Sequence, residues 1–303
     1  MAGVLALGEC MVELSLAGAG AARVGYAGDT FNTAVYLRRL GRAVSYATAL
    51  GGDDPFSRGI AELMAAEGID ASLVVRAPDR VPGLYAIERD AAGERRFFYW
   101  RDQAPVRDFF TLADKDSLRA AMRAAELIYF SAITLAVIGE AGRASLVALL
   151  GEAGDTAVAF DTNYRARLWP GADAARAAIE AVVPHCRYIS TSEPDLETLY
   201  AEPMEATAAR WAQAGAEVVA RREDRQVSVL GADGPFTLPA TPGVKATDTT
   251  GAGDSFNAGY LAARLAGREP TAAVEAGRRL SAVVVQHVGA IIPPGAMPEL
   301  GGG

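Results

Sequence analysis

The stretch Asp248-Thr249-Thr250-Gly251-Ala252-Gly253-Asp254-Ser255-Phe256-Asn257-Ala258-Gly259 runs from a loop of small residues into a helical pattern. Such a junction presents free backbone N–H groups and the positive end of a helix dipole, which favour a phosphate or a developing anion. Asp254 has the wrong charge for binding phosphate, but the right charge for accepting a proton from an attacking hydroxyl. The stretch therefore predicts phosphoryl transfer to an alcohol.

A purely structural interpretation makes Asp254 an ordinary helix N-cap, since Asp is common at that position. A Gly-Ala-Gly loop before a helix also arises easily by chance. The full string is much more specific, because acids stand on both sides of the glycines and Ser-Phe-Asn-Ala-Gly follows. The anion-site interpretation is therefore preferred.

Composition restricts the class of protein. The chain has 303 residues, 50% of them hydrophobic, which suffices for one large α/β domain or two modest ones. A net charge of −8 without a basic run argues against nucleic acid as a partner. Cys10 and Cys186 are isolated, as are His185 and His287, so neither a disulfide framework nor a protein-held metal site is expected.

No segment has the character of a signal peptide or a membrane span. No Lys or Arg precedes Arg23, and Glu9 and Glu13 interrupt the opening apolar stretch. Leu127–Gly139 is too short to cross a bilayer, and two prolines interrupt Leu280–Pro298. A cytoplasmic protein without a membrane partner is expected.

Short β-rich runs alternate with Ala- and Leu-rich helical patterns along most of the chain. This alternation predicts an α/β fold, a doubly wound, mostly parallel sheet with helices on both faces. The expected strands are Val4–Gly8, Val44–Ala49, Leu127–Phe130, Ala157–Asp161, Tyr188–Thr191, Val218–Ala220 and Val227–Leu230. The expected helices are Thr30–Leu40, Phe56–Glu67, Asp114–Ala124, Gly139–Leu150, Asp173–Val183, Met204–Ala214, Ser255–Ala266 and Thr271–Gln286. Gly41 and Gly267 mark two helix ends.

Two regions do not follow this alternation of strands and helices and are expected to form a small β lid. Met11–Gly28 and Val81–Arg101 have extended patterns with no helix between them. The second region ends in Arg95–Arg101, where four aromatic residues stand between cationic ones. Aromatic strands often line a sheet face without any further role. The pairing of Tyr99 with Arg101 on an insertion favours a ligand-binding role.

Polar residues precede the first expected helix and follow the fourth expected strand. Gly28 would let a ligand approach the backbone, while Asp29 and Asn32 could bind sugar hydroxyls, although a simple helix cap is the alternative. Asp161–Arg165 follows a central strand, where open α/β sheets bind ligands, although Asn163 could simply form a turn. A guanidinium in that crevice would bind a carboxylate or shield phosphate charge.

These motifs together resemble the ribokinase-like (phosphofructokinase-B-type) carbohydrate kinases over nearly the whole chain. Asp248–Gly259 resembles the family's carboxy-proximal signature, and Ala27–Asn32 resembles its amino-proximal sugar site. Within the family, the chain is similar to 2-keto-3-deoxygluconate kinases, and more selective motifs carry that likeness: Gly8–Leu14, Gly83–Tyr85, Phe98–Arg101, Asp161–Trp169 and Gly289–Pro293. The resemblance implies one ribokinase-like kinase domain over 1–303, with a β lid from about 11–28 and 81–101 that often forms a homo-oligomer contact.

The resemblance also implies the reaction. The γ-phosphoryl group of ATP would move to O6 of 2-dehydro-3-deoxy-D-gluconate, giving 2-dehydro-3-deoxy-6-phospho-D-gluconate. Asp254 would be the base for the 6-hydroxyl, and the N–H groups of Gly251, Ala252 and Gly253 would form the anion hole.

Substrate and cofactor positions follow from the same resemblance. The sugar acid and its attacking hydroxyl would contact Gly28, Asp29, Asn32, Tyr85, Tyr99, Arg101, Arg165 and Asp254. The ATP phosphates would lie near Asn163, Arg165, Ser192, Gly251, Ala252 and Gly253. Two arginines suit a substrate with a carboxylate better than a neutral hexose. Mg²⁺ would accompany ATP, held largely by phosphate and water rather than by a cage of protein carboxylates.

Three departures from the family pattern keep alternatives open. Ala220–Asp224 replaces the usual Lys-x-Gly-type turn, Ser192–Asp195 replaces the Asn-x-x-Glu motif, and Ala27 replaces a glycine. A kinase for fructose, ribose or 2-keto-3-deoxygalactonate is one alternative, and a non-catalytic sugar or nucleotide sensor is another. A dinucleotide oxidoreductase is disfavoured, because no G-x-G-x-x-G follows the first strand.

Overall fold

A computed structural model of the chain describes residues 3–16, 20–89, 95–232 and 234–299. Its centre is a nine-stranded sheet with the strand order β13-β12-β11-β10-β9-β8-β1-β4-β5. The strands are β1 (Val4–Leu7), β4 (Val44–Gly51), β5 (Val74–Ala77), β8 (Leu127–Ser131), β9 (Ala157–Asp161), β10 (Tyr188–Ser192), β11 (Glu217–Arg221), β12 (Val227–Leu230) and β13 (Phe236–Leu238). β12 pairs antiparallel with both β11 and β13, and the remaining pairs in this sheet are parallel. The predicted α/β class is confirmed.

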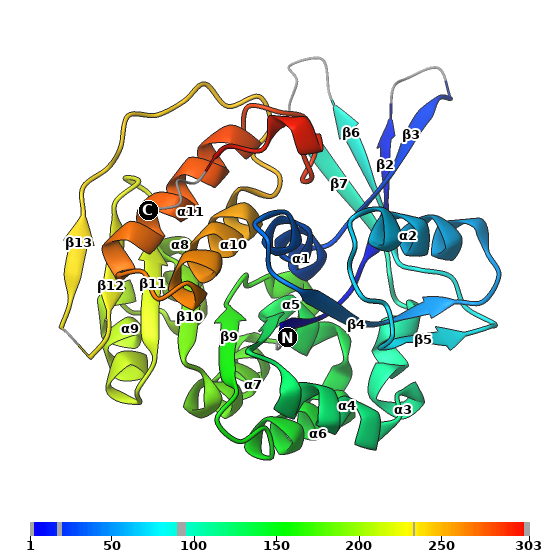
Figure 1. The fold of residues 1–303 in the computed structure, drawn as a ribbon, viewed down its shortest axis with the longest axis horizontal. Coiled ribbons are helices and arrows are strands. Elements are labelled where there is room, and N and C mark those ends of the chain that lie inside the picture. The colour runs from blue at the N-terminus through cyan, green and yellow to red at the C-terminus, as the bar shows by residue number, and fades with distance from the viewer. Residues whose placement is uncertain (1–2, 17–19, 90–94, 233, 300–303) are drawn as a thin grey trace.

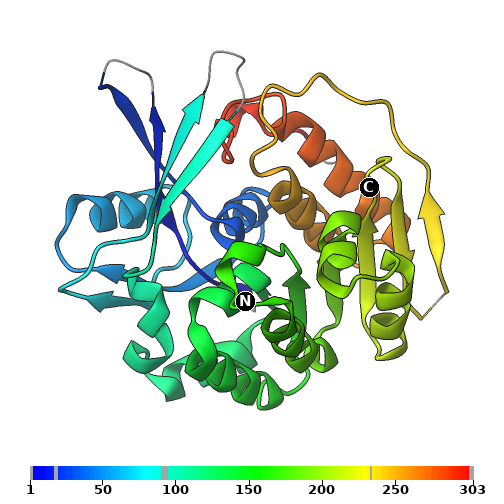
Figure 2. The ribbon, with the colours of Figure 1, turned by 180° about the vertical axis from the view of Figure 1, so that it is seen from behind.

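Helices cover both faces of this sheet (Figures 1 and 2). One face is covered by α1 (Asp29–Arg39), α2 (Pro55–Ala66), α10 (Ala252–Leu265) and α11 (Pro270–Val284). The other is covered by α3 (Phe109–Leu112), α4 (Lys115–Ala124), α5 (Ala132–Val137), α6 (Gly139–Gly151), α7 (Ala172–Val182), α8 (Glu193–Tyr200) and α9 (Met204–Gln213). Short 3₁₀ helices span Pro105–Asp108, Ala166–Leu168, Val183–His185 and Pro294–Ala296.

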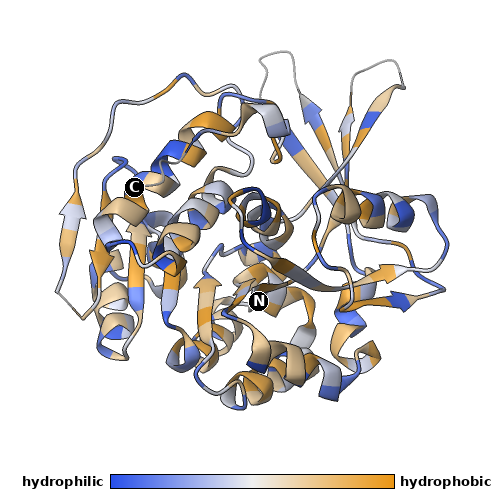
Figure 3. Cartoon of the chain, in the orientation of Figure 1, coloured by the Kyte–Doolittle hydropathy of each residue, from blue (hydrophilic) through white to orange (hydrophobic). Residues whose placement is uncertain are grey.

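The two helical layers enclose two separate hydrophobic cores. Ile128 and Phe130 of β8 enter one core, and Leu127 and Tyr129 of the same strand enter the other. Successive strand side chains point to opposite faces, so a strand buried on both sides must be apolar throughout. The covering helices alternate between hydrophobic and hydrophilic segments (Figure 3), as expected for helices with one buried side.

The two extended segments form a second, four-stranded sheet with the order β3-β2-β6-β7. Its strands are β2 (Met11–Leu16), β3 (Ala22–Ala27), β6 (Leu84–Arg89) and β7 (Arg95–Trp100). This lid sheet projects beyond the main sheet on one side of the molecule (Figures 1 and 2). The predicted lid ranges also include residues 17–19 and 90–94, which lie outside the described residues.

Several elements differ from the sequence-based expectation. α10 begins at Ala252 rather than Ser255, so the helix already includes the alanine and second glycine of the motif. α3, α5, α8, β5 and β13 were not predicted, although Ser131 and Ser192 each cap a following helix through a side-chain oxygen. Gly41 and Gly267 have φ angles of +86° and +75°, which confirms the two predicted helix ends. Within the described residues, no helix is long and apolar enough to cross a bilayer.

Candidate active site

A cavity of about 760 Å³ lies where the main sheet, the lid and α10 meet. β9, β10 and β11 are parallel, so their carboxyl ends share one edge of the sheet, and this is where open α/β sheets bind ligands. Almost all of the predicted site residues line this cavity: Gly28, Asp29, Asn32, Tyr85, Tyr99, Arg101, Asn163, Arg165, Gly251, Ala252, Gly253 and Asp254. Ser192 does not line it, and its hydroxyl caps α8 by accepting a hydrogen bond from the Asp195 N–H.

The amino end of α10 opens directly into the cavity. Gly251 is the N-cap residue, with a φ of +77° and no side-chain cap, so the dipole and the first-turn amides are available to a ligand. The Ala252 N–H makes a long bond of 3.3 Å to the Thr249 carbonyl, which leaves it only weakly committed. A Cβ at Gly251 would lie 2.7 Å from the Ala290 carbonyl oxygen, so the close backbone approach requires glycine.

Asp254 is the third residue of α10, and its carboxylate faces the cavity. The N-cap alternative for Asp254 is wrong, because Gly251 occupies that position. Asp254 is only 9% exposed, and its Oδ2 accepts a hydrogen bond of 2.7 Å from Asn32 Nδ2. Burial raises the pKa of Asp254 to about 8; the charge of Asp29 adds to this rise and the Asn32 bond opposes it. A carboxyl group poised near neutral pH is suited to accept a proton.

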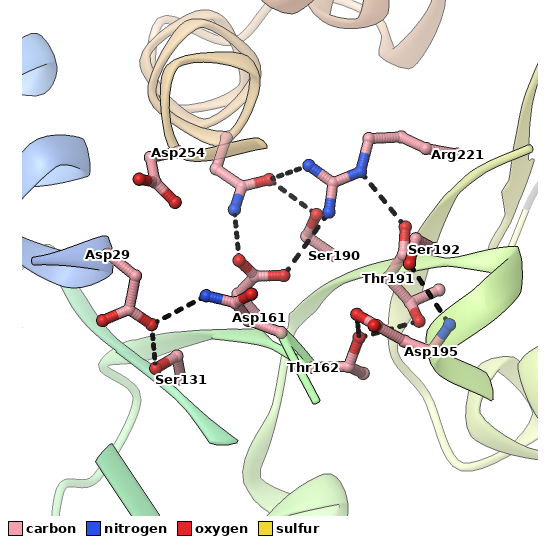
Figure 4. Close-up of polar contacts among 12 residues, drawn as sticks. Asp29, Ser131, Asp161, Thr162, Ser190, Thr191, Ser192, Asp195, Arg221 and Asp254 are labelled. Carbon is pink, nitrogen blue, oxygen red and sulfur yellow. Dashed lines mark hydrogen bonds and ion pairs between the residues drawn. The ribbon is translucent and has the colours of Figure 1, made fainter. Parts of the chain in front are cut away.

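The start of α1 supplies the neighbouring wall. Gly28 is the N-cap of α1 and no side chain caps this helix, so the alternative of a cap by Asp29 or Thr30 is wrong. Asp29 Oδ2 instead accepts a hydrogen bond from Ser131 Oγ (Figure 4). It accepts a second one, of 3.0 Å, from Asn163 Nδ2. Gly28 has an extended backbone, and a Cβ there would lie 2.0 Å from the Glu9 carbonyl oxygen. Close packing therefore requires this glycine.

Arg101 is paired within the protein. Its guanidinium forms an ion pair with Glu9, and the two side chains are 8% and 5% exposed. Burial raises the pKa of Glu9, against the lowering effect of Arg101. Glu9 Oε1 and Arg101 Nε have no hydrogen-bond partner among the described residues. Arg101 is thus less free for a substrate carboxylate than its sequence context suggested, and Glu9, overlooked as a site residue, lies in the motif Gly8–Leu14.

Arg221 is a second site residue that was overlooked. Ala220–Asp224 was interpreted as an altered loop, but β11 continues through Arg221, whose guanidinium enters the cavity (Figure 4). Arg221 Nη2 lies 3.6 Å from Asp161 Oδ1, and a Cβ at Gly253 would lie 2.9 Å from Arg221 Nη1. Burial raises the pKa of Asp161 to about 6, and Arg221 opposes that rise. A cation therefore lies beside the amino end of α10.

Arg165 and the lid tyrosines complete the site. The Arg165 side chain is 46% exposed, and its Nη1 lies 3.9 Å from Asp195 Oδ1. On the lid, the Tyr85 and Tyr99 rings stack with centroids 5.7 Å apart, and the Tyr85 hydroxyl donates to Glu13. Among the described residues, no group of three or more His, Cys, Asp or Glu side chains could hold a metal.

The sequence matches the pfkB family carbohydrate kinase profile over residues 1–296. It is 40% identical to the 2-dehydro-3-deoxygluconokinase of Dickeya dadantii, over 96% of this chain and 97% of that protein. It is 37% identical to the 2-dehydro-3-deoxygluconokinase of Escherichia coli K12, over 97% of this chain and 98% of that protein.

Solved structures have the same fold. A PfkB protein from Polaromonas has a TM-score of 0.82 at 26% identity, covering 94% of this chain and 96% of its own. A ribokinase II from Escherichia coli, solved in complex with ATP and Mg²⁺, has a TM-score of 0.83 at 20% identity, covering 99% of this chain and 97% of its own. The fold is ribokinase-like, and the chain belongs to the pfkB family of carbohydrate kinases.

Proposed function

We propose that this carbohydrate kinase transfers the γ-phosphoryl group of ATP to O6 of 2-dehydro-3-deoxy-D-gluconate, giving 2-dehydro-3-deoxy-6-phospho-D-gluconate. The observation that carries the proposal is the buried Asp254 carboxylate beside the uncapped amino end of α10, inside a cavity covered by the lid. The identity to two 2-dehydro-3-deoxygluconokinases supports the substrate. Residues 1–303 would act as one kinase domain, and the use of ATP suits the cytoplasm.

Each group in the cavity would have a definite task. Asp254 would accept the proton of the 6-hydroxyl while the new O–P bond forms and the bond between the γ-phosphorus and the bridging oxygen of ADP breaks. Asn32 would hold the Asp254 carboxylate in place through its 2.7 Å hydrogen bond. The amides of Gly251, Ala252 and Gly253, together with Arg221, would stabilise the charge on the transferring group. The sugar would lie against Gly28, Asp29 and Asn32 under Tyr85 and Tyr99.

The nucleotide would lie on the open side of the cavity. Asn163 and Arg165 would bind its phosphates directly, and Ser192, which does not line the cavity, would bind them through water. Mg²⁺ would be held mainly by phosphate oxygens and water, because the described residues offer no cluster of three acidic ligands. Asp161 Oδ1, which is buried and has no hydrogen-bond partner in the described part of the chain, could accept a hydrogen bond from a water in that shell.

Substrate choice tests the proposal. We expect Mg·ATP-dependent ADP release with 2-dehydro-3-deoxy-D-gluconate at a kcat/KM at least about 100-fold above that with fructose, ribose or 2-keto-3-deoxygalactonate, because leaving one buried polar group of the site unpaired costs up to about 3 kcal/mol. A coupled ADP assay with ³¹P NMR of the product would identify the sugar and the phosphorylated oxygen. Equal turnover of neutral sugars would refute the substrate, and no turnover of any sugar would favour the sensor.

We further propose that the outer face of the lid binds a second copy of the chain. That face exposes Trp100 and Leu16, 61% and 42% accessible, and lines an apolar groove of about 480 Å³ with Leu14, Phe56, Val81, Pro82, Leu84 and Ala86. A contiguous apolar patch of this kind marks an interaction surface, and a self-complementary one favours a two-fold dimer.

Trp100→Glu should convert that dimer to a monomer at micromolar concentration, because it places a charge in the apolar contact. Analytical ultracentrifugation would measure the mass. Leu112→Glu is the matched control, since Leu112 is also 42% exposed but lies on α3, away from the lid. A wild-type monomer, or equal masses for both variants, would contradict the proposed contact.

A further inference from the structure

Of the residues that the structure describes, four arginines line the cavity, and three of them already face a carboxylate. Arg101 is paired with Glu9, Arg165 lies 3.9 Å from Asp195, and Arg221 lies 3.6 Å from Asp161. The fourth is Arg167, which takes part in none of the ion pairs among the residues that the structure describes. Its charge is therefore the one most available to an incoming anion.

Arg167 lies between the body of the protein and the lid. It belongs to the 3₁₀ helix Ala166–Leu168, which directly follows Asp161–Arg165 in the chain. Its guanidinium carbon lies 3.6 Å from the centroid of the Tyr99 ring on β7. An arginine stacked flat on a ring keeps the N–H groups at its edge free to bind a carboxylate with two parallel hydrogen bonds. Stacking also limits the side-chain freedom that binding would otherwise cost.

The charge of the cavity makes such a residue necessary for an acidic substrate. Glu9, Asp29, Asp161 and Asp254 all line the same cavity. A substrate carboxylate near these acids would be repelled unless it also met a cation that no protein carboxylate already faces. The carboxylate of 2-dehydro-3-deoxy-D-gluconate lies at the opposite end of the sugar chain from O6. Arg167 lies against the lid, whereas Asp254, the proposed base for O6, lies on α10.

We propose that Arg167, held on Tyr99, is the specificity-determining residue that recognises the carboxylate of the sugar acid; this rests on the proposed function. Arg101, fixed by Glu9, then positions the lid strand behind the substrate. Arg167 acts on binding and not on the proton transfer. Its contribution should therefore appear in KM for an acid substrate, with little change in kcat.

The test uses two substrates that differ only at the first carbon. 2-Dehydro-3-deoxy-D-gluconate carries the carboxylate, and 3-deoxy-D-fructose carries a hydroxymethyl group in its place. Arg167→Gln should raise KM for the acid about 10- to 30-fold, as expected for the loss of a charge-assisted pair, and change kcat/KM for the neutral sugar less than about twofold. Arg167→Lys should recover part of the loss, because it keeps the charge without the planar fork.

Arg187→Gln is the matched control, because Arg187 also lies over a tyrosine ring, that of Tyr188, but at the amino end of β10, away from the cavity. It should leave both substrates unaffected. Equal losses on both substrates in Arg167→Gln would reduce Arg167 to a lid contact and overturn the inference, as would an unchanged KM for the acid. Failure of the proposed function is distinguishable, because the wild-type enzyme itself would then not phosphorylate the acid.

Discussion

Asp254→Asn should lower kcat about 10³-fold while largely sparing sugar binding. The amide has nearly the shape of the carboxylate and can still bond to Asn32, but it cannot accept the proton of the attacking hydroxyl, a role worth about 10²- to 10⁴-fold in rate. Steady-state kinetics would give kcat, and calorimetry with the sugar alone would give its affinity. Asp114→Asn is the matched control, because Asp114 is the N-cap of α4 and asparagine caps equally well. A kcat within about threefold of wild type would make Asp254 a structural residue.

The pH dependence of Asp254→Asn distinguishes the catalytic role of Asp254 from its effect on stability. The pKa of Asp254 rises from 3.8 to about 8 on folding, so the base is half ionised near pH 8 and mostly protonated below it. The kcat/KM of the wild type should therefore fall about tenfold per pH unit below that value, and this fall should be absent from the residual activity of Asp254→Asn.

A raised pKa of Asp254 also means that the stability of the fold is lost as pH rises from about 4 to 8. Asp254→Asn avoids this loss, so its Tm at pH 8 should not be below that of the wild type.

Gly251→Ala should lower kcat about 100-fold and also destabilise the fold. Alanine at a φ of +77° costs about 1–2 kcal/mol, and its Cβ would press on the Ala290 carbonyl from 2.7 Å away. Relief of that contact would turn the first amides of α10 away from the transferring phosphoryl group, where a single lost donor costs about 10²- to 10³-fold. The measurements are kcat with saturating Mg·ATP and urea unfolding.

Gly267→Ala is the control that measures the cost of placing alanine at a positive φ without a steric clash. Gly267 has a similar φ of +75°, but a Cβ there would meet no atom of the described residues within 4 Å, and the residue lies at the far end of α10. It should lose about 1 kcal/mol of stability and keep full kcat. If both alanine variants kept wild-type kcat, the amino end of α10 would not be the anion hole.

Most of the secondary structure could be predicted, because its signals are local. Strands such as β8 and β9 are short apolar runs, and the ends of α1 and α10 are marked by Gly41 and Gly267. α5 was missed because it continues the uncharged run of β8, where periodicity alone does not separate strand from helix. The predicted start of α10, Ser255, lies three residues after the observed start because the glycines of Gly-Ala-Gly have low helix propensity. Tertiary packing sets the position of this helix beneath the cavity.

The sequence by itself determined the α/β class, the two extended segments outside the main sheet, the family, and the string that puts an acid beside a helix start. Each of these depends on residues close together in the chain. Only the tertiary structure decided which charges are free. Asn32 reaches Asp254 across 222 positions, and Arg101 reaches Glu9 across 92. Desolvation and ion pairing act between groups that packing brings together. Three features could therefore be recognised only in the folded chain: the raised pKa of Asp254, the ion pair that Arg101 forms with Glu9, and the absence of a carboxylate beside Arg167 among the described residues.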